Sequence, residues 1–257
     1  MRNSTAAAQQ YLYAIVSAET VGSWGPIGVN KAQVAAITDG PVAAVVSTIA
    51  GQRARPERTN LAAHNGVLKL LMQDHAVLPV VFGTIARSPK AVRSMLVKNQ
   101  AVFLKQLDYV KGRVEMGLRM HFDVPNIYDY MVNVRPELQE LRDAAYGNQR
   151  VPTRGVKIDL GREFNHLLDE ERAIHTATVV AVLRAHCVEI KHNPPRHERE
   201  VLNLACLIAR EDLKAFEAAV LEAASQFDNN VAFNFTGPWA PYNFVDIQLG
   251  ADDVAHQ

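Results

Sequence analysis

The sequence predicts an α+β fold of two domains, each built from a mainly antiparallel sheet with packed helices. The chain of 257 residues is longer than one typical domain of roughly 150 residues. Segments in which apolar and polar residues alternate, as in half-buried strands, are interspersed with segments of helical periodicity. A mainly helical stretch at about 123–192 separates two of the strands. We therefore expect an N-terminal domain at 1–111 and a C-terminal domain at 112–257 that carries this stretch as an insertion.

The N-terminal domain is expected to begin with a strand and a β-hairpin. The nearly continuous apolar run Tyr11–Ala18 is typical of a strand that is covered on both faces. Two β-rich runs follow, and they flank Asp39-Gly40, a residue pair that favours a tight hairpin turn. These runs are Lys31–Thr38 and Pro41–Ile49.

The rest of the N-terminal domain is predicted to be helix, strand and helix. The first helix has Pro56 in its first turn, and Val77–Thr84 then forms a strand. Ser88 is a good N-cap residue and Pro89 suits the first helical position, so a second helix is expected from there to about Val110.

The C-terminal domain is expected to have ferredoxin-like strand pairing with a helical hairpin inserted. Its clearest strand is Val114–Phe122, where apolar and polar residues alternate strictly. Strand, helical insertion, strand, helix and strand follow one another in the βαββαβ manner. The further elements expected are helices at Pro136–Tyr146 and from Asp159 or Gly161 onward, a strand at Val201–Ala209, a helix from Glu211 to about Phe227, and a last strand that begins at Val231 and stops at Thr236-Gly237-Pro238.

Composition excludes several classes of protein. Lys+Arg 27 against Asp+Glu 27 gives no net charge, which argues against binding to nucleic acid or to an acidic membrane through a global field. No apolar run is long enough for a transmembrane helix, and the first ten residues lack the apolar region of a signal peptide. The 2 cysteines are too few for a disulfide scaffold. We therefore expect a cytoplasmic protein.

Two features are candidates for partner binding. The proline-interrupted segment after the last strand carries three large rings, and these must pack either on the protein's own sheet or on a partner. The rings are those of Trp239, Tyr242 and Phe244. The second feature is a loop that carries Arg53, Arg55 and Arg58, which is either an anion-binding or partner-binding patch or a solvated loop before a helix.

No pattern predicts a metal, a cofactor or a catalytic centre. His186, Cys187, His192, His197 and Cys206 lack the paired short spacing of zinc ligands, and Cys206 lies in an apolar strand where cysteine behaves as a small hydrophobe. Motifs for nucleotide binding and for nucleophilic catalysis are missing. An alternative hypothesis is a small-molecule enzyme whose site lies between the two domains. That site would use His121, His197, Glu198 and Arg199.

Six segments, in order along nearly the whole chain, carry a family resemblance. They are YLYAIV at Tyr11–Val16, PERTNLAAHNGVLKL at Pro56–Leu70, VLPVVFGTI at Val77–Ile85, VEMGLRM at Val114–Met120, HEREVLNLACLI at His197–Ile208 and FTGPWAPYNFV at Phe235–Val245. Together they resemble the gas vesicle accessory proteins of the GvpF/GvpL family. The sequence departs from the family pattern at Val81, where many members have arginine, and at Ala240, where the motif has proline.

The resemblance implies an assembly protein that transforms no substrate. A member of this family would be an accessory or minor component of gas vesicles. It would bind the small, very hydrophobic shell protein GvpA, and other accessory proteins could join it. By covering this sticky subunit, it would prevent aggregation during vesicle nucleation. It would require no cofactor and would act in the cytoplasm at the gas vesicle.

Overall fold

The computed structural model describes residues 8–20, 22–49, 54–146, 152–247 and 254–255. Two compact units make up the chain: the first is Met1–Glu115 with Pro238–Gln257, and the second is Met116–Gly237. The expected boundary between 111 and 112 is therefore close to the observed one, but the expected C-terminal domain differs from the observed unit at its end. Residues 238–257 belong to the first unit, where Phe244 is buried and Tyr242 is half-buried, as described below.

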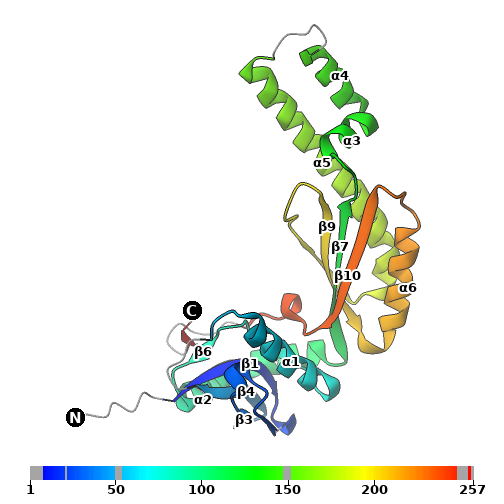
Figure 1. Ribbon diagram of the computed structural model, residues 1–257. Helices are drawn as coiled ribbons and strands as arrows, with labels where there is room; N and C mark the ends of the chain where they lie inside the picture. The colour runs from blue at the N-terminus through cyan, green and yellow to red at the C-terminus, as the bar shows by residue number, and fades with distance from the viewer. Residues whose placement is uncertain (1–7, 21, 50–53, 147–151, 248–253, 256–257) are drawn as a thin grey trace, which may run out of the picture. The chain divides into compact units, whose positions relative to one another are not determined.

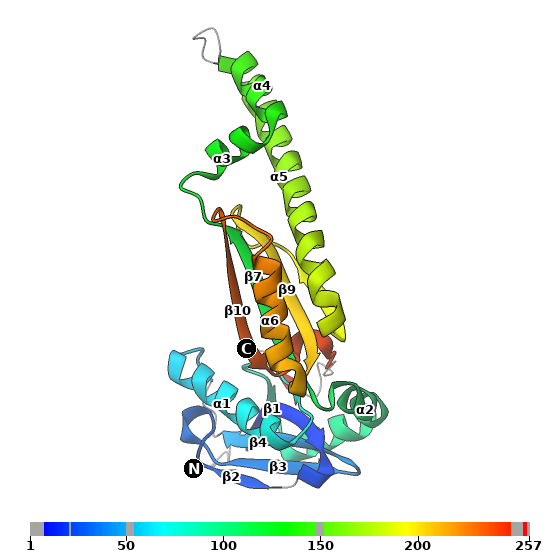
Figure 2. The ribbon, with the colours of Figure 1, turned by 90° about the vertical axis from the view of Figure 1, so that its right-hand side faces the viewer.

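The first unit contains a seven-stranded sheet with the order β11-β6-β1-β4-β3-β2, and β5 also pairs with β1. Strand β1 is antiparallel to β4, β5 and β6, which places it in the middle of the sheet (Figures 1 and 2). The strands are β1 (Gln9–Ser17), β2 (Ser23–Gly25), β3 (Val34–Asp39), β4 (Val42–Ile49), β5 (Leu78–Pro79), β6 (Ile85–Ala86) and β11 (Val254–Ala255). The predicted hairpin is confirmed: Asp39 pairs with Val42, and Gly40 has a φ of 58°.

Helices pack on both faces of strand β1, which explains its continuous apolar run. On one face, Leu12 and Ile15 join a core with the helix α2 (Pro89–Val110). On the other face, Tyr11 and Tyr13 contact the helix α1 (Arg58–Asp74). Burial on both faces removes the alternation that a half-exposed strand would show.

The two helices begin for different reasons. The hydroxyl of Ser88 accepts the N–H of Ala91 at 3.2 Å, so the predicted cap of α2 is confirmed. Helix α1 begins at Arg58, later than expected, and Pro56 lies before it rather than in its first turn.

The expected strand Val77–Thr84 is wrong as one element. Within it only Leu78–Pro79 forms a strand, β5; a turn in which Gly83 has a φ of 90° follows, and the strand β6 begins after Thr84. Pro79 ends β5 because its nitrogen has no hydrogen to donate to a ladder. Pairing with β1 is kept on both sides of the turn, through Val80 N–H to Tyr13 O and Leu12 N–H to Thr84 O.

The second unit is a four-stranded sheet with the order β10-β7-β9-β8, and α5 and α6 pack against each other and against β9 (Figure 2). The strands are β7 (Arg113–Phe122), β8 (Glu189–Asn193), β9 (Glu200–Ala209) and β10 (Val231–Trp239). The helices are α3 (Ile127–Val134), α4 (Pro136–Tyr146), α5 (Arg154–Leu183) and α6 (Leu213–Ala224). The α+β class and the βαββαβ order are as expected, with α3 and α4 inserted before α5.

Several boundaries in the second unit differ from the expected ones, and α6 is shorter than expected at both ends. Helix α5 begins at Arg154 rather than at Asp159 or Gly161, because Thr153 caps it. The stretch expected to be helical up to residue 192 ends in the strand β8, which pairs antiparallel with β9. Strand β10 continues to Trp239 through Gly237, whose φ of 133° suits glycine.

Within the described ranges, no helix has the length and apolar character that a membrane span requires.

Candidate interaction surfaces

The segment Trp239–Val245, which we call the C-terminal hook, is anchored in the first unit by a chain of buried hydrogen bonds. The imidazole of His64 lies in the middle, with Nδ1 2.9 Å from the Tyr11 hydroxyl and Nε2 3.0 Å from the Tyr242 hydroxyl. Gly83 N–H donates to the Tyr11 oxygen at 3.2 Å, and the Tyr242 hydroxyl donates to the carbonyl oxygen of Val80 at 3.4 Å.

The hydrogen bonds at the two ends of this series, to Gly83 and to Val80, determine the tautomer of His64. Because Tyr242 donates its hydrogen to a carbonyl, its oxygen accepts from Nε2–H, and Nδ1 accepts from the Tyr11 hydroxyl. A neutral imidazole satisfies every group, whereas a protonated one would lose the Tyr11 donation. Burial lowers the pKa of His64 to about 4, and burial raises the pKa of Tyr11 and of Tyr242.

A second anchor joins the hook to the start of strand β7. The carboxylate of Glu115 accepts from Asn243 twice, from the backbone N–H at 2.8 Å and from the side-chain Nδ2–H at 2.6 Å. Phe244, the residue after Asn243, is buried. Two of the three rings considered for partner binding, those of Tyr242 and Phe244, therefore pack within the protein. Trp239 is 36% exposed, and the Lys69 ammonium lies 5.1 Å from its ring centre.

The basic loop is only partly described. Arg53 lies outside the described residues, whereas Arg55 and Arg58 are exposed. The carbonyl oxygen of Arg55 accepts from the Asn60 side chain, and Arg58 opens helix α1. The loop therefore leads directly into helix α1, and its role in binding a partner stays a prediction.

Figure 1 shows α3, α4 and the N-terminal part of α5, which we call the helical arm. Among the described residues of the second unit, exposed large apolar side chains are most numerous on this arm. Six large apolar side chains here are between 40% and 50% exposed. They are Tyr128, Val134, Leu141, Tyr146, Val156 and Ile158. Sequence reasoning did not identify them as a surface, because the residues of three helices had to be brought together first.

Two shallow grooves run between the helices of the arm. One of about 390 Å³ lies among α3, α4 and α5, and aromatic and aliphatic side chains line most of it. The other, of about 450 Å³, lies between α4 and α5 near their connection. Residues that line the grooves include Tyr128, Leu138, Phe164, Leu141, Val156 and Leu160. The arm therefore offers apolar surface with concave places for a partner's side chains.

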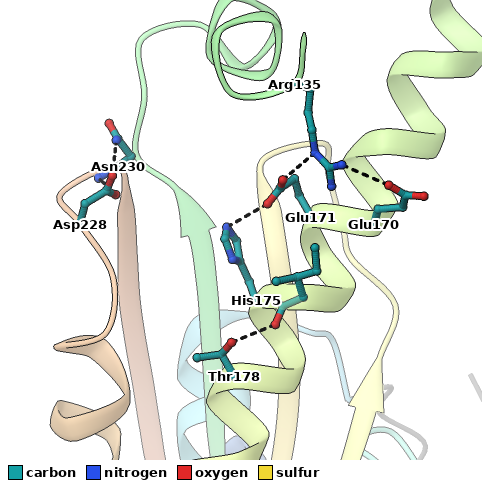
Figure 3. Close-up of polar contacts among 8 residues, drawn as sticks. Arg135, Glu170, Glu171, His175, Thr178, Asp228 and Asn230 are labelled. Carbon is teal, nitrogen blue, oxygen red and sulfur yellow. Dashed lines mark hydrogen bonds and ion pairs between the residues drawn. The ribbon is translucent and has the colours of Figure 1, made fainter. Parts of the chain in front are cut away.

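An ionic cluster fixes the base of the arm to α5 (Figure 3). The Arg135 guanidinium donates from Nε to Glu171 at 2.7 Å and from Nη1 to Glu170 at 3.2 Å. His175 lies 3.7 Å from Glu171 on the same helix, and burial lowers the pKa of its imidazole. Because Arg135 lies between α3 and α4, these ion pairs hold the junction of the two helices against α5.

Three of the four residues named for an enzymatic alternative take part in structural contacts of the second unit. Tyr128 donates its hydroxyl hydrogen to Glu198 at 3.1 Å, and Arg199 donates to the carbonyl oxygen of Pro125 at 2.8 Å. The backbone carbonyls of His197 and Glu198 accept from Arg172. His121 lies on β7 and is half-buried.

A larger groove of about 800 Å³ lies along α5, β8 and β9, and two of its charged groups, Asp169 and Arg172, are engaged in structural contacts. The Arg172 guanidinium contacts Asp169 at 2.8 Å and donates to the carbonyl oxygens of Glu198 and Glu200. Among the described residues, no group of three or more His, Cys, Asp or Glu side chains could hold a metal ion.

Comparison with known proteins gives a consistent result. The family model described as "Gas vesicle synthesis protein GvpL/GvpF" matches residues 9–246. Gas vesicle protein F of Streptomyces sp. (strain CB03234) is 27% identical over 224 residues, which cover 86% of this chain and 92% of that protein. Gas vesicle protein L of the same strain is 26% identical over 200 residues, which cover 76% and 71% of the two chains.

Solved structures show the same fold. The crystal structure of the gas vesicle protein GvpF from Anabaena sp. PCC7120 has a TM-score of 0.81 at 22% identity, covering 94% of this chain and 100% of that one. GvpF from Microcystis aeruginosa has a TM-score of 0.78 at 19% identity, with the same two coverages. The match to the family model covers nearly the whole chain and confirms the resemblance seen in the six segments. The matched family is one of gas vesicle proteins and not an enzyme family, and the chain belongs to it: it is a member of the GvpL/GvpF family of gas vesicle synthesis proteins.

Proposed function

We propose that this protein binds the hydrophobic gas vesicle shell protein GvpA and prevents its aggregation while a vesicle nucleates. It acts at the gas vesicle as an assembly protein or a minor component, and it transforms no substrate. The observation that supports this proposal is the exposed apolar surface of the helical arm, with its two grooves.

The magnitude of this surface suits a reversible contact. Fully burying a large apolar side chain is worth about 1.5–3 kcal/mol, so covering a side chain that is already half-buried gives about 1 kcal/mol. Six such side chains lie on the arm. Together they supply several kcal/mol before the cost of association, which is enough to hold a partner and still release it.

A strand-rich, apolar shell subunit needs such a partner because its exposed edges and faces pair with other copies. The arm presents helices rather than a free strand edge. It can therefore cover apolar surface on the subunit without offering a template for further strand pairing. The exposed ring of Trp239 is a second, smaller contact candidate on the first unit.

Co-expression with the shell protein tests this proposal. In the test variant, Leu141, Val156 and Ile158 on the arm are each changed to Gln. The matched control changes Val97 and Val102, which are 56% and 52% exposed on α2, in the same way. We expect the wild type and the control to keep the shell protein in the supernatant and to co-purify with it.

The arm variant should lose this effect while its far-ultraviolet circular dichroism stays unchanged. Loss of about 3 kcal/mol of contact free energy would weaken binding by roughly 100-fold. If the arm variant retains the shell protein as well as the control does, the arm is not the contact surface. If the wild type itself does not co-purify, and deleting its gene leaves vesicle number unchanged, the proposed function is refuted.

A further inference from the structure

The imidazole of His175 lies at the centre of the ionic cluster that joins α3 and α4 to α5 (Figure 3). Its Nε2 atom is 3.7 Å from Oε2 of Glu171, which is one turn earlier on the same helix. The other oxygen of that carboxylate accepts from Nε of Arg135 at 2.7 Å. Glu171 therefore links the imidazole to the segment between α3 and α4.

Two phenylalanine rings from other parts of the second unit pack against this imidazole. The ring centre of Phe122, at the end of β7, is 6.0 Å from that of His175, and the ring centre of Phe227, just after α6, is 5.3 Å away. Tyr130 of α3 in turn contacts Phe122 at 5.3 Å, and burial raises the pKa of its hydroxyl, which therefore stays neutral. His175 thus lies where α5 meets β7, α3 and the turn after α6.

The polar atoms of this site are incompletely satisfied. Nε2 of His175 and Nη2 of Arg135 are buried, and among the described residues no group forms a hydrogen bond with either atom. A separation of 3.7 Å is too long for Glu171 to accept a hydrogen bond from Nε2. In a neutral imidazole only one ring nitrogen carries hydrogen, whereas in an imidazolium both do. Protonation here would therefore remove a charged ring from water without giving Nε2 a hydrogen bond.

The nearby charges offset only part of this cost. The negative charges of Glu171 and Asp228 favour a protonated ring. The Glu171 carboxylate, however, is shared with Arg135, and Asp228 accepts two hydrogen bonds from Asn230, at 2.9 Å and 2.7 Å. Burial has the largest effect, so the pKa of His175 lies below its ordinary value of 6.5.

We propose that His175 is an acid-sensitive latch, which in its neutral form holds α3, α4 and the turn after α6 against α5 and releases them when it binds a proton. Release follows because an imidazolium is more stable in water than between the rings of Phe122 and Phe227. The stabilisation is complete above pH 6.5, the value for an exposed histidine, and is lost as the pH falls below it. This inference does not depend on the proposed function, because it concerns only contacts within the second unit.

Amide hydrogen exchange of the full chain tests the proposal. Each exchange rate is compared with that of an unstructured chain at the same pH, so that the ratio, the protection factor, reports opening of the structure. The probes are the N–H groups of Tyr130, Arg135 and Phe227, which form backbone hydrogen bonds around the site. We expect their protection in the wild type to fall at least about threefold from about pH 7.5 to about pH 5.

Two substitutions show whether His175 is the titrating group. His175→Phe keeps an aromatic ring beside Phe122 and Phe227 but cannot bind a proton, so the acid-dependent fall in protection should disappear. His166→Gln is the matched control, because His166 is exposed on the same helix and lies 3.4 Å from Glu170. This control should behave as the wild type does. His175→Gln also lacks a titrating ring, and it serves if His175→Phe fails to fold.

Three results of the exchange measurement would overturn the proposal. They are wild-type protection that does not change over this pH range, an equal fall in the His175 variants, and protection that rises as the pH falls. The last result would show that the imidazolium pairs with Glu171 and closes the site. As a second readout, the nuclear magnetic resonance titration of the His175 ring should have its midpoint below 6.5, and a midpoint at or above this value would also contradict the latch.

Discussion

The buried His64 should make the first unit sensitive to acid. Its folded-state pKa of about 4 is below the 6.5 of an exposed histidine, so the unfolded chain binds the proton more readily. The stabilising contribution is therefore fully present above pH 6.5 and is lost as the pH falls from there toward 4. At about 1.4 kcal/mol for each pH unit, the full loss is about 3 kcal/mol.

The chain provides a specific probe for this measurement. Its two tryptophans, Trp24 and Trp239, both belong to the first unit, so tryptophan fluorescence in a urea titration follows the unfolding of that unit alone. The variant His64→Gln removes the titrating group. His75, an exposed residue directly after the same helix, provides the matched control His75→Gln.

We expect the wild type and His75→Gln to lose about 2 kcal/mol more of their unfolding free energy than His64→Gln does between pH 6.5 and pH 4.5. All three proteins share the loss from carboxylates, so the difference isolates His64. If His64→Gln shows the same pH dependence as the wild type, the proposed hydrogen-bond chain through a neutral imidazole is not what stabilises the hook.

Three further substitutions test other contacts. Glu115→Ala removes both acceptors of Asn243 and should destabilise the first unit by about 2–4 kcal/mol in the same fluorescence assay, whereas Glu57→Ala should change it little. Gly28→Ala should also be severely destabilising, because its added methyl group would lie 2.6 Å from Ser47 Oγ and 2.8 Å from the Ala32 carbonyl oxygen. An unchanged urea midpoint of unfolding would show that the loop can move aside. Arg135→Ala removes the guanidinium that pairs with Glu170 and Glu171. Amide exchange in α3 and α4 should then become at least tenfold faster, while exchange in α6 is unchanged. Equal protection of α3 and α4 in the wild type and the variant would contradict the role given to this cluster.

Local signals predicted those parts of the fold that local chemistry controls. Ser88 with Pro89, and Asp39 with Gly40, fix a helix start and a hairpin through backbone preferences that any chain would show. The strict alternation in β7 likewise needs only one buried face. These elements were found where the sequence placed them.

Elements that depend on a distant partner could not be read in this way. Strand β8 is a partly exposed edge strand whose residues do not alternate clearly, so only its pairing with β9 makes it a strand. The start of α5 was misplaced because the polar segment that ends at Gly155 is typical of a loop, whereas the Thr153 cap lets the helix begin at Arg154 and continue through Gly155.

The candidate surfaces likewise depend on contacts between residues that are far apart in the sequence. The sequence singled out the rings of the hook but could not show that Tyr242 reaches His64, a residue 178 positions away. It also could not assemble the exposed side chains of the arm, because each of the three helices contributes only a few of them.

The return of Pro238–Gln257 to the first unit affects the order in which the protein is completed during translation. The second unit has all its residues once Gly237 has been made, whereas the first unit lacks Tyr242 and Asn243 until the segment after Gly237 leaves the ribosome. A ribosome that stalls at Gly237 would hold a second unit with all its residues and a first unit in which His64 lacks Tyr242 and Glu115 lacks Asn243. The segment made after the second unit therefore decides whether the first-made half of the protein becomes stable.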